Sequence, residues 1–173
     1  MYEPREDSFL LLKHIKKYAK SLVLDMGTGS GILAEEAAKY ADKVLGVDIN
    51  EKAIEYCKKK FNNINNLRFR NSDLFSNIKE KFNLIIFNPP YLSSEPKAPD
   101  TALDGGKQGY EVIEQFLKKA KNYLKEKGVI LLLFSSLSKK NKIDSILKEE
   151  NYKYQEIDKE HIHFEELYVY KIQ

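Results

Sequence analysis

The sequence is poor in sulfur and lacks tryptophan: its 173 residues include one cysteine and two methionines. A lone cysteine excludes an internal disulfide framework and a cysteine-cluster metal site. Cys57 follows Ala53 and Ile54 at helical spacing, so we interpret it as a buried core thiol rather than a catalytic nucleophile. Long apolar runs are also missing. The longest, over residues 129–134, suits a buried strand and is far too short to span a membrane.

The sequence also has no strong excess of positive or negative charge. The 29 Lys and Arg residues exceed the 26 Asp and Glu residues by a formal net charge of +3, which does not establish nucleic-acid binding. The lysine runs at 58–60 and 118–119 are typical of solvated helix faces. The N-terminus has no basic-then-apolar secretory signal. These absences predict a cytoplasmic protein with no membrane partner, and the length suits one compact domain over residues 1–173.

Short β-rich runs alternate with helical patterns along most of the chain. The near-continuous apolar character of several runs is typical of strands covered on both faces, as in a parallel sheet. The alternation therefore predicts a doubly wound α/β domain. Strands are predicted at residues 21–26, 43–48, 67–71, 82–87 and 129–135. Helices are predicted around residues 9–15, after the N-cap Asn50, and over 112–124.

The C-terminal part departs from this alternation. A helix is predicted over 140–150, followed by strands at 152–157 and 167–172. The connection between these two strands is too short for a crossover helix, so they must run antiparallel. The sequence thus predicts a mostly parallel seven-stranded sheet that ends in an antiparallel hairpin.

A glycine-rich segment closes the first predicted strand. It contains Asp25, Gly27, Gly29 and Gly31 and leads into a helix. Ligands of open α/β sheets bind beyond the carboxyl ends of the strands. Glycines there allow unusual backbone angles and let the backbone approach a ligand closely. The segment is therefore a candidate ligand-binding loop.

Two further carboxylates mark neighbouring strand ends. Asp48 ends the second predicted strand, where it can accept hydrogen bonds from both hydroxyls of a ribose. Asp73 follows the third predicted strand, where it can accept from the amino group of an adenine. Because parallel strands end at one edge of a sheet, these groups predict an adenosine-containing ligand. The plainer alternative is that all three aspartates are turn or cap residues.

A dinucleotide is the main competitor for this loop. Its fingerprint is G-x-G-x-x-G, and in this sequence the third glycine comes one residue early. A dinucleotide also needs a helix N-terminus free for its pyrophosphate, which the carboxylate of Asp25 would repel. The same carboxylate suits a ligand that carries an ammonium and a sulfonium. Charge sign therefore favours S-adenosylmethionine as the cofactor.

A second motif follows the fourth predicted strand. Asn88, Pro89, Pro90 and Tyr91 would indicate no more than a turn if they stood alone. Beside a cofactor pocket, the Asn88 side-chain oxygen and the Pro89 carbonyl can each accept one N–H of a planar NH2 group. The prolines restrict the backbone, and Tyr91 can stack on a flat acceptor. The motif predicts methylation of a planar amino nitrogen, whose growing positive charge the two oxygens stabilise.

The motifs together resemble a known family. The loop at 25–31, the two strand-end aspartates and the Asn-Pro-Pro-Tyr motif are similar to those of class I methyltransferases that modify amino groups. This resemblance implies the strand order 3-2-1-4-5-7-6 with strand 7 antiparallel. The opening Tyr2–Phe9 and the stretch Ala102–Gly109 resemble the HemK-type release-factor glutamine methyltransferases, in their short archaeal and eukaryotic branch.

The resemblance implies a substrate, a partner and further site residues. The substrate is the glutamine side-chain amide in the Gly-Gly-Gln loop of a peptide-chain release factor. A small zinc-binding activator subunit is the implied partner. Ser8, with Asp7, is implied to lie near the methionine end of the cofactor.

Other interpretations stay open at this point. An N6-adenine or N2-guanine methyltransferase acting on DNA or RNA would use the same amino-group contacts on a flipped base. A non-catalytic cofactor-binding scaffold is also possible in principle, although a scaffold has no need for Asn88. His14, His161 and His163 lack matching thiols, and we expect surface or hydrogen-bonding roles rather than a metal site. The long segment at 92–108 is interpreted as a lid.

The third strand, at 67–71, carries a further prediction. In the implied order it is the outermost strand at one end of the sheet, where its free backbone groups need cover. Leu67 and Phe69 alternate with Arg68 and Arg70. Either the arginines protect this edge, or an activator subunit adds a strand to it.

Overall fold

A computed structural model describes residues 5–90, 109–162 and 165–173. The strands are β1 (Leu22–Met26), β2 (Lys43–Asp48), β3 (Leu67–Asn71), β4 (Phe82–Phe87), β5 (Leu124–Ser135), β6 (Tyr154–Ile162) and β7 (Glu165–Ile172). The helices are α1 (Glu6–Tyr18), α2 (Ile32–Ala38), α3 (Glu51–Lys60), α4 (Glu111–Ala120) and α5 (Lys140–Glu149), with short 3-10 turns at Lys121–Tyr123 and Ser136–Ser138. Tyr91, the expected lid at 92–108 and His163 lie outside the described residues.

The predicted sheet is confirmed in strand order and direction. Its seven strands lie in the order β3-β2-β1-β4-β5-β7-β6. β1 pairs in parallel with β2 and β4, β2 with β3, and β4 with β5. β7 runs antiparallel to both of its neighbours, β5 and β6. The chain therefore has the class I methyltransferase topology, which brings the carboxyl ends of β1, β2 and β4 to one edge of the sheet.

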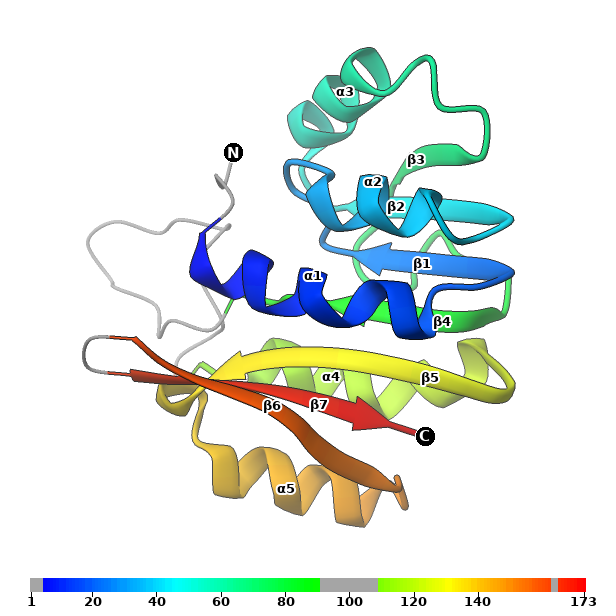
Figure 1. Ribbon diagram of the computed structural model, residues 1–173. Coiled ribbons are helices and arrows are strands. Elements are labelled where there is room, and N and C mark those ends of the chain that lie inside the picture. Colours follow the sequence, from blue (N-terminus) through cyan, green and yellow to red (C-terminus); the bar gives the residue numbers. More distant parts are fainter. Residues whose placement is uncertain (1–4, 91–108, 163–164) are drawn as a thin grey trace.

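Helices cover both faces of the sheet, and each face has its own hydrophobic core (Figure 1). Helices α1, α2 and α3 pack on one face through side chains such as Leu11, Ala34 and Cys57. Helices α4 and α5 pack on the other face through side chains such as Phe116 and Ile146. Cys57 is fully buried, as its helical spacing predicted. Apolar burial on both faces explains why the central strands are apolar without alternation.

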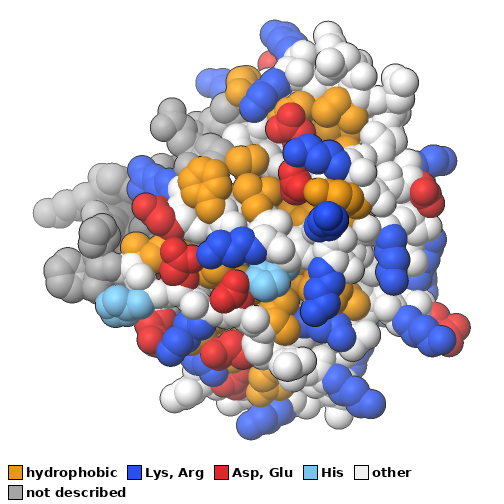
Figure 2. Space-filling view, viewed as in Figure 1, with side chains coloured by type: hydrophobic (Ala, Val, Ile, Leu, Met, Phe, Trp, Pro, Cys, Tyr) orange, Lys and Arg blue, Asp and Glu red, His pale blue; other side chains and the backbone are white. Residues whose placement is uncertain are grey.

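Helix α1 is fastened to the hairpin at the far end of the sheet. Lys13 pairs with Glu160 at 3.2 Å, and His14 Nε2 lies 2.7 Å from the Asp158 carboxylate, which joins α1 to β6. Acidic and basic side chains are intermixed over this face of the molecule (Figure 2). His14 thus has the hydrogen-bonding role expected for it.

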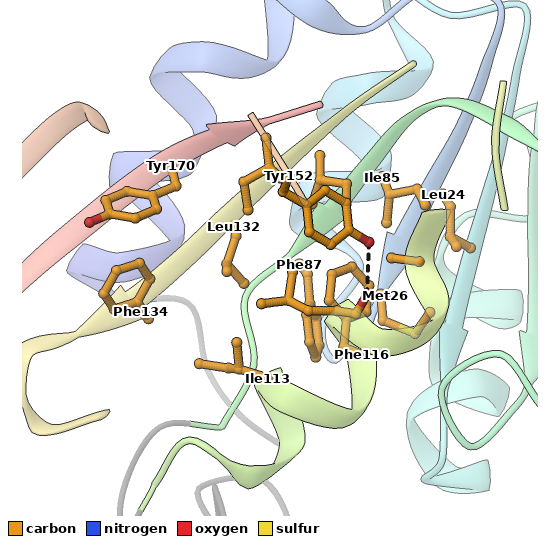
Figure 3. Close-up of a cluster of buried hydrophobic side chains, with 14 of the residues drawn as sticks. Leu24, Met26, Ile85, Phe87, Ile113, Phe116, Leu132, Phe134, Tyr152 and Tyr170 are labelled. Atoms are coloured by element: carbon orange, nitrogen blue, oxygen red, sulfur yellow. Dashed lines mark hydrogen bonds between the residues drawn. The ribbon is translucent and has the colours of Figure 1, made fainter. Parts of the chain in front are cut away.

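Aromatic side chains fill the core between the sheet and α4. Phe87 at the end of β4 lies against Phe116 of α4, with ring centroids 4.4 Å apart (Figure 3). The Tyr152 hydroxyl donates to the carbonyl of Leu117 at 2.7 Å, so the buried ring keeps a partner for its polar atom. This packing fixes α4 against the end of β4, where the Asn88 motif begins.

Two strands, β5 and β6, differ from their predicted bounds by more than two residues. β5 begins at Leu124, which the helical pattern had assigned to the preceding helix. Leu124 pairs with Phe82 and Val129 with Leu84, so the chain bulges between them, with Lys127 in the left-handed region at a φ of 61°. Leu124 still packs on the core next to α4, which is why it satisfied the helical spacing.

The other difference concerns the hairpin. β6 covers Tyr154–Ile162, later and longer than the predicted strand at 152–157. It is an edge strand with little buried surface, and its second half is mostly charged or polar. Such a segment carries no apolar alternation, so the pattern could not reveal it. Among residues 5–90, 109–162 and 165–173, no helix is long and apolar enough to cross a membrane.

Candidate active site

A cavity of about 350 Å³ opens at the carboxyl ends of β1, β2 and β4. This volume lies within the range of small-molecule sites, roughly 300–1,000 Å³. Most of the predicted site residues line it together: Ser8, Gly27, Gly29, Asp48, Asp73, Asn88, Pro89 and Pro90. Asp25 and Gly31 do not line it, and Tyr91 lies outside the described residues.

The loop between β1 and α2 forms the floor of the cavity. Gly27, Gly29 and Gly31 all have positive φ, at 68°, 50° and 80°. A Cβ on Gly31 would lie 2.5 Å from the ring of Phe61 and 3.1 Å from Cys57 Sγ. Position 31 therefore requires glycine, because of its positive φ and because a side chain would collide with Phe61 and Cys57. Gly27 and Gly29 instead face the cavity.

Asp48 is held in place by two backbone amides. Its Oδ2 accepts from the Gly29 N–H at 2.9 Å, and its Oδ1 accepts from the Asn50 N–H at 2.9 Å. Each oxygen keeps a second lone pair for a ligand hydroxyl. The bond to Gly29 also occupies a loop amide that a pyrophosphate would need, which adds to the case against a dinucleotide.

Asp25 lies beneath the loop rather than in the cavity. It is fully buried, and its Oδ2 accepts from the Thr28 hydroxyl at 2.6 Å. Burial away from water raises the pKa of Asp25 to about 7, against the opposing effect of the Thr28 hydrogen bond. Asp25 therefore supports the loop from below, and any effect on a cofactor's positive charge acts through the loop.

The third strand end forms a tight turn around Ser72. The Ser72 hydroxyl, from a buried side chain, donates to the Leu74 carbonyl at 2.8 Å and accepts from the Asn77 N–H at 3.0 Å. Leu74 has a φ of 44°, which a non-glycine residue adopts only when its surroundings impose it. The turn places Asp73 and Leu74 side by side on the cavity wall.

Asn88 reaches the cavity from the end of β4. Its Nδ2 donates to the Asp7 carboxylate at 3.0 Å, across 81 residues of sequence. Its Oδ1 is buried and has no hydrogen-bond partner among the described residues. A buried acceptor without a partner costs about 1–3 kcal/mol, so its retention points to a ligand that donates to it.

Several lining residues escaped the sequence patterns. Ile49, Val112 and Gln115 all line the cavity, the last two from α4, whereas Asp7, which also lines it, was implied by the family resemblance. Ile49 directly follows Asp48 and is 61% exposed, but single exposed apolar residues are common on protein surfaces and carry no sequence signal of a ligand contact. Val112 and Gln115 carry no signal either, because only the packing of α4 against β4 brings them to the site.

Comparison with known proteins places the chain in a family. Residues 6–165 match the model of the methyltransferase small domain. A protein from Methanocaldococcus jannaschii named as a protein N5-glutamine methyltransferase is 42% identical over 98% of this chain and 89% of its own length. The fold is that of a class I methyltransferase, and the chain belongs to the methyltransferase small domain family.

Two further relatives narrow the resemblance. The release factor glutamine methyltransferase of Thermodesulfovibrio yellowstonii is 32% identical over 75% of this chain, which spans 54% of that protein. The solved structure of the E. cuniculi Mtq2–Trm112 complex, described as responsible for methylation of the eRF1 translation termination factor, contains a similar chain. That chain superposes with a TM-score of 0.82 at 26% identity, covering 99% of this chain and 97% of its own length. The resemblance to the HemK-type glutamine methyltransferases is thereby confirmed.

Proposed function

We propose that this enzyme methylates the side-chain amide of a glutamine in a peptide-chain release factor, with S-adenosylmethionine as the methyl donor. The observation that carries the proposal is the buried, unpartnered Oδ1 of Asn88, which shares one cavity with Asp48 and Asp73. That oxygen suits an N–H donor at one end of the cavity, while the two aspartates suit an adenosine at the other.

The cavity residues fit S-adenosylmethionine. The Asp48 carboxylate, fixed by two amides, would accept from the ribose hydroxyls, and Asp73 would accept from the adenine amino group. Ile49 and Leu74 supply apolar surface for the flat base, and Ser8 lines the cavity beside Asn88. When bound, the cofactor supplies a methyl group on a positively charged sulfur. We assign these contacts as the binding set of the cofactor.

The acceptor side explains why an amide can react. An amide nitrogen is a weak nucleophile because its lone pair is delocalised. The Asn88 Oδ1 and the Pro89 carbonyl would each accept one N–H, which fixes the nitrogen and stabilises the positive charge that it gains. Pro89 is buried and Pro90 partly buried, so the backbone of the motif is restrained on both sides. We expect Tyr91 to stack on the acceptor.

The substrate is proposed from the names of the relatives. The test is methyl transfer from labelled cofactor to a purified release factor, with the modified residue located by mass spectrometry. A factor with Gly-Gly-Gln changed to Gly-Gly-Asn should lose methylation, because the shorter side chain cannot bring its amide to the Asn88 acceptor. Equal labelling of DNA or RNA would favour the base-methylating alternative. Cofactor binding without transfer to any acceptor would favour a scaffold.

Charge distribution supports the protein substrate over nucleic acid. Nucleic-acid enzymes neutralise many phosphates and usually present a continuous basic surface. The formal net charge of this chain is only +3, and the face in Figure 2 mixes both signs. Lys13 and Lys159 are each paired with a glutamate, Glu160 and Glu166 respectively. A chain that acts on release factors works where translation occurs, and we infer that residues 1–173 act as one catalytic domain in the cytoplasm.

We further propose that a small, zinc-binding activator subunit pairs with β3. As the outermost strand, β3 bonds to β2 on one side only. The Asn66 carbonyl and the Ser72 N–H face β2. By the alternation of a parallel ladder, the backbone groups of Leu67, Phe69 and Asn71 therefore face outward.

This edge is only partly covered. The Arg68 guanidinium donates to the Leu67 carbonyl at 2.7 Å, and the Asn77 side chain donates to the Asn71 carbonyl at 3.0 Å. The outward N–H and C=O of Phe69 have no partner in the described part of the chain. The Arg68 side chain thus covers only part of the β3 edge. The backbone N–H and C=O of Phe69 remain open for pairing with an added strand.

A further inference from the structure

Asp7, which lines the same cavity, holds the Asn88 side chain by a direct hydrogen bond. It lies in the first turn of α1, is 3% exposed, and accepts the Asn88 Nδ2–H at its Oδ2 over 3.0 Å. Its Oδ1 accepts the backbone N–H of Ser8 at 2.6 Å. Both oxygens are therefore engaged, which fixes the carboxylate on the helix that carries it.

The charge on Asp7 decides which way the Asn88 amide faces. A carboxylate accepts hydrogen bonds and cannot donate them, so it selects the NH2 side of the amide. A flipped amide would place Oδ1 against a negative oxygen and turn Nδ2 towards the position of Oδ1. The flip is thus opposed by charge repulsion and by the loss of one charge-assisted hydrogen bond. Oδ1, the buried atom without a partner among the described residues, is the atom left facing away from Asp7.

We propose that Asp7 is a positioning residue for methyl transfer, which keeps the Asn88 Oδ1 turned towards the N–H of the acceptor. It acts through Asn88 and does not touch the acceptor. The inference rests on the proposed function, in which the Asn88 Oδ1 accepts a hydrogen bond from the acceptor amide. It explains why one of the two possible orientations of the Asn88 amide prevails. Because Asp7 belongs to α1 and Asn88 follows β4, it also makes the first turn of α1 a part of the catalytic geometry.

The isosteric substitution Asp7→Asn tests the role of the charge. The oxygen of the amide introduced at position 7 can still accept from the Ser8 N–H. Its NH2 group then faces Asn88, so the Asn88 amide must flip to accept a hydrogen bond from it. The flipped amide offers N–H to an acceptor that also carries N–H. We expect kcat to fall on the order of 10- to 100-fold, less than the roughly 100- to 1,000-fold loss that follows when a transition-state hydrogen-bonding group is removed outright. Affinity for the demethylated cofactor should fall much less than kcat, since the shape of the site is kept and both Asp7 oxygens are engaged by Ser8 and Asn88. Glu6→Gln is the matched control, because it removes an exposed carboxylate from the same helical turn and should leave kcat unchanged.

A reciprocal exchange separates orientation from simple packing. The double variant Asp7→Asn with Asn88→Asp swaps the amide and the carboxylate between the two positions. The amide introduced on α1 can donate to one oxygen of the carboxylate introduced after β4 and leave the other oxygen facing the acceptor. The double variant should therefore be about tenfold or more faster than Asp7→Asn alone, a non-additivity expected only for groups in direct contact. A merely structural role predicts that two substitutions are worse than one.

A second readout needs no acceptor. In the wild-type chain the Asn88 side-chain NH2 signals, assigned by their loss in Asn88→Ala, should be protected from hydrogen exchange and should shift in Asp7→Asn. Wild-type transfer to the release factor tests the proposed function, whereas the ratios among variants, measured on whichever amino acceptor is methylated, test Asp7. An Asp7→Asn enzyme with kcat within twofold of wild type overturns the inference. So does a double variant no faster than Asp7→Asn.

Discussion

Gly29 and Asp48 are joined by a hydrogen bond of 2.9 Å from the backbone amide of one to the carboxylate of the other. The bond ties the loop after β1 to the end of β2, so that two sides of the cofactor pocket are fixed relative to each other. The second oxygen of Asp48 is fixed by the amide of Asn50, at the start of α3. A carboxylate that is already in place spares the ligand an ordering cost on binding.

This relationship predicts a loss of cofactor affinity in Asp48→Ala. The substitution removes the ribose acceptor and releases the Gly29 amide. Loss of charge-assisted hydrogen bonds should weaken S-adenosylmethionine binding by about 1.5–3 kcal/mol, measured by calorimetry. Asp42→Ala is the control, because Asp42 is an exposed aspartate bonded to the Ser21 hydroxyl at the opposite end of β1. Undiminished affinity in Asp48→Ala would contradict the assigned ribose contact.

Asn88→Ala should separate binding from chemistry. Affinity for the cofactor should stay within a few-fold, while turnover falls by about two to three orders of magnitude, because the lost oxygen acts mainly on the acceptor. Single-turnover methyl transfer gives the rate and calorimetry gives the affinity. Asn83→Ala on β4, the strand that Asn88 follows, is the control, since the Asn83 side chain accepts from the Leu22 amide far from the cavity. Full turnover in Asn88→Ala would refute the mechanism.

Asp25 predicts a pH-dependent stability. Burial raises its pKa from 3.8 to about 7, so the folded chain holds a proton that the unfolded chain releases at lower pH. The stability tied to this group is complete below pH 3.8 and is lost as the pH rises through 7. Asp25→Asn is neutral at every pH and should therefore be more stable than wild type at about pH 8.5, by at most about 4 kcal/mol. The gain should shrink towards zero at about pH 4, as measured by denaturant unfolding. An equal gain at both pH values would show that Asp25 is not buried as a titrating acid.

Much of this structure could be predicted because the signals are local. The strand that ends at Asp48 and the loop at Gly27 and Gly29 follow from apolar runs closed by glycine and aspartate. The sheet order then brings those ends together, so the cavity followed from the topology. The sequence could not show that Asp25 and Gly31 turn away from the cavity, because a loop has two sides and the pattern does not distinguish them.

Contacts between elements that are far apart in the sequence could not be predicted from it. The Asp7–Asn88 hydrogen bond joins residues 81 positions apart, and no spacing rule connects them. β6 was misplaced for a related reason: an edge strand is defined by its partner, and its own residues are mostly polar. Gln115 likewise reaches the cavity only because α4 packs against the end of β4.

Gly31→Ala should destabilise the fold more than Gly29→Ala. Both substitutions place a Cβ on a residue with positive φ, which costs about 1–2 kcal/mol. At Gly31 the new atom would also lie 2.5 Å from the Phe61 ring, whereas at Gly29 its nearest neighbour lies at 3.9 Å. Displacing the ring should add roughly 1–3 kcal/mol. The free energies of unfolding should differ accordingly, and Phe61→Leu should relieve part of the Gly31→Ala penalty. Equal losses at the two glycines would show that backbone angle alone decides.

The β3 edge can be tested without disturbing the core. Proline at Phe69 would remove the open donor, but Phe69 is only 9% exposed and its ring stacks on Phe61, so that change would also damage the core. A hollow beside the strand offers a cleaner position. It is lined by Lys58, Phe61, Asn62, Leu67, Arg68 and Phe69.

Asn62→Trp should weaken pairing with an activator subunit. Asn62 is exposed on the rim of the hollow, and a strand added to β3 would lay its side chains over that hollow. A bulky indole there should weaken binding of a co-expressed small zinc protein by about tenfold or more, or roughly 1.4 kcal/mol. Asn63→Trp is the matched control, because Asn63 is an exposed neighbour that does not line the hollow. Size-exclusion chromatography and calorimetry give the readout.

If both variants bind the partner equally well, the subunit docks elsewhere. If the wild-type monomer alone methylates the release factor as fast as it does with the partner, catalysis needs no strand added at Phe69. The Arg68 and Asn77 side chains then serve only to protect this edge.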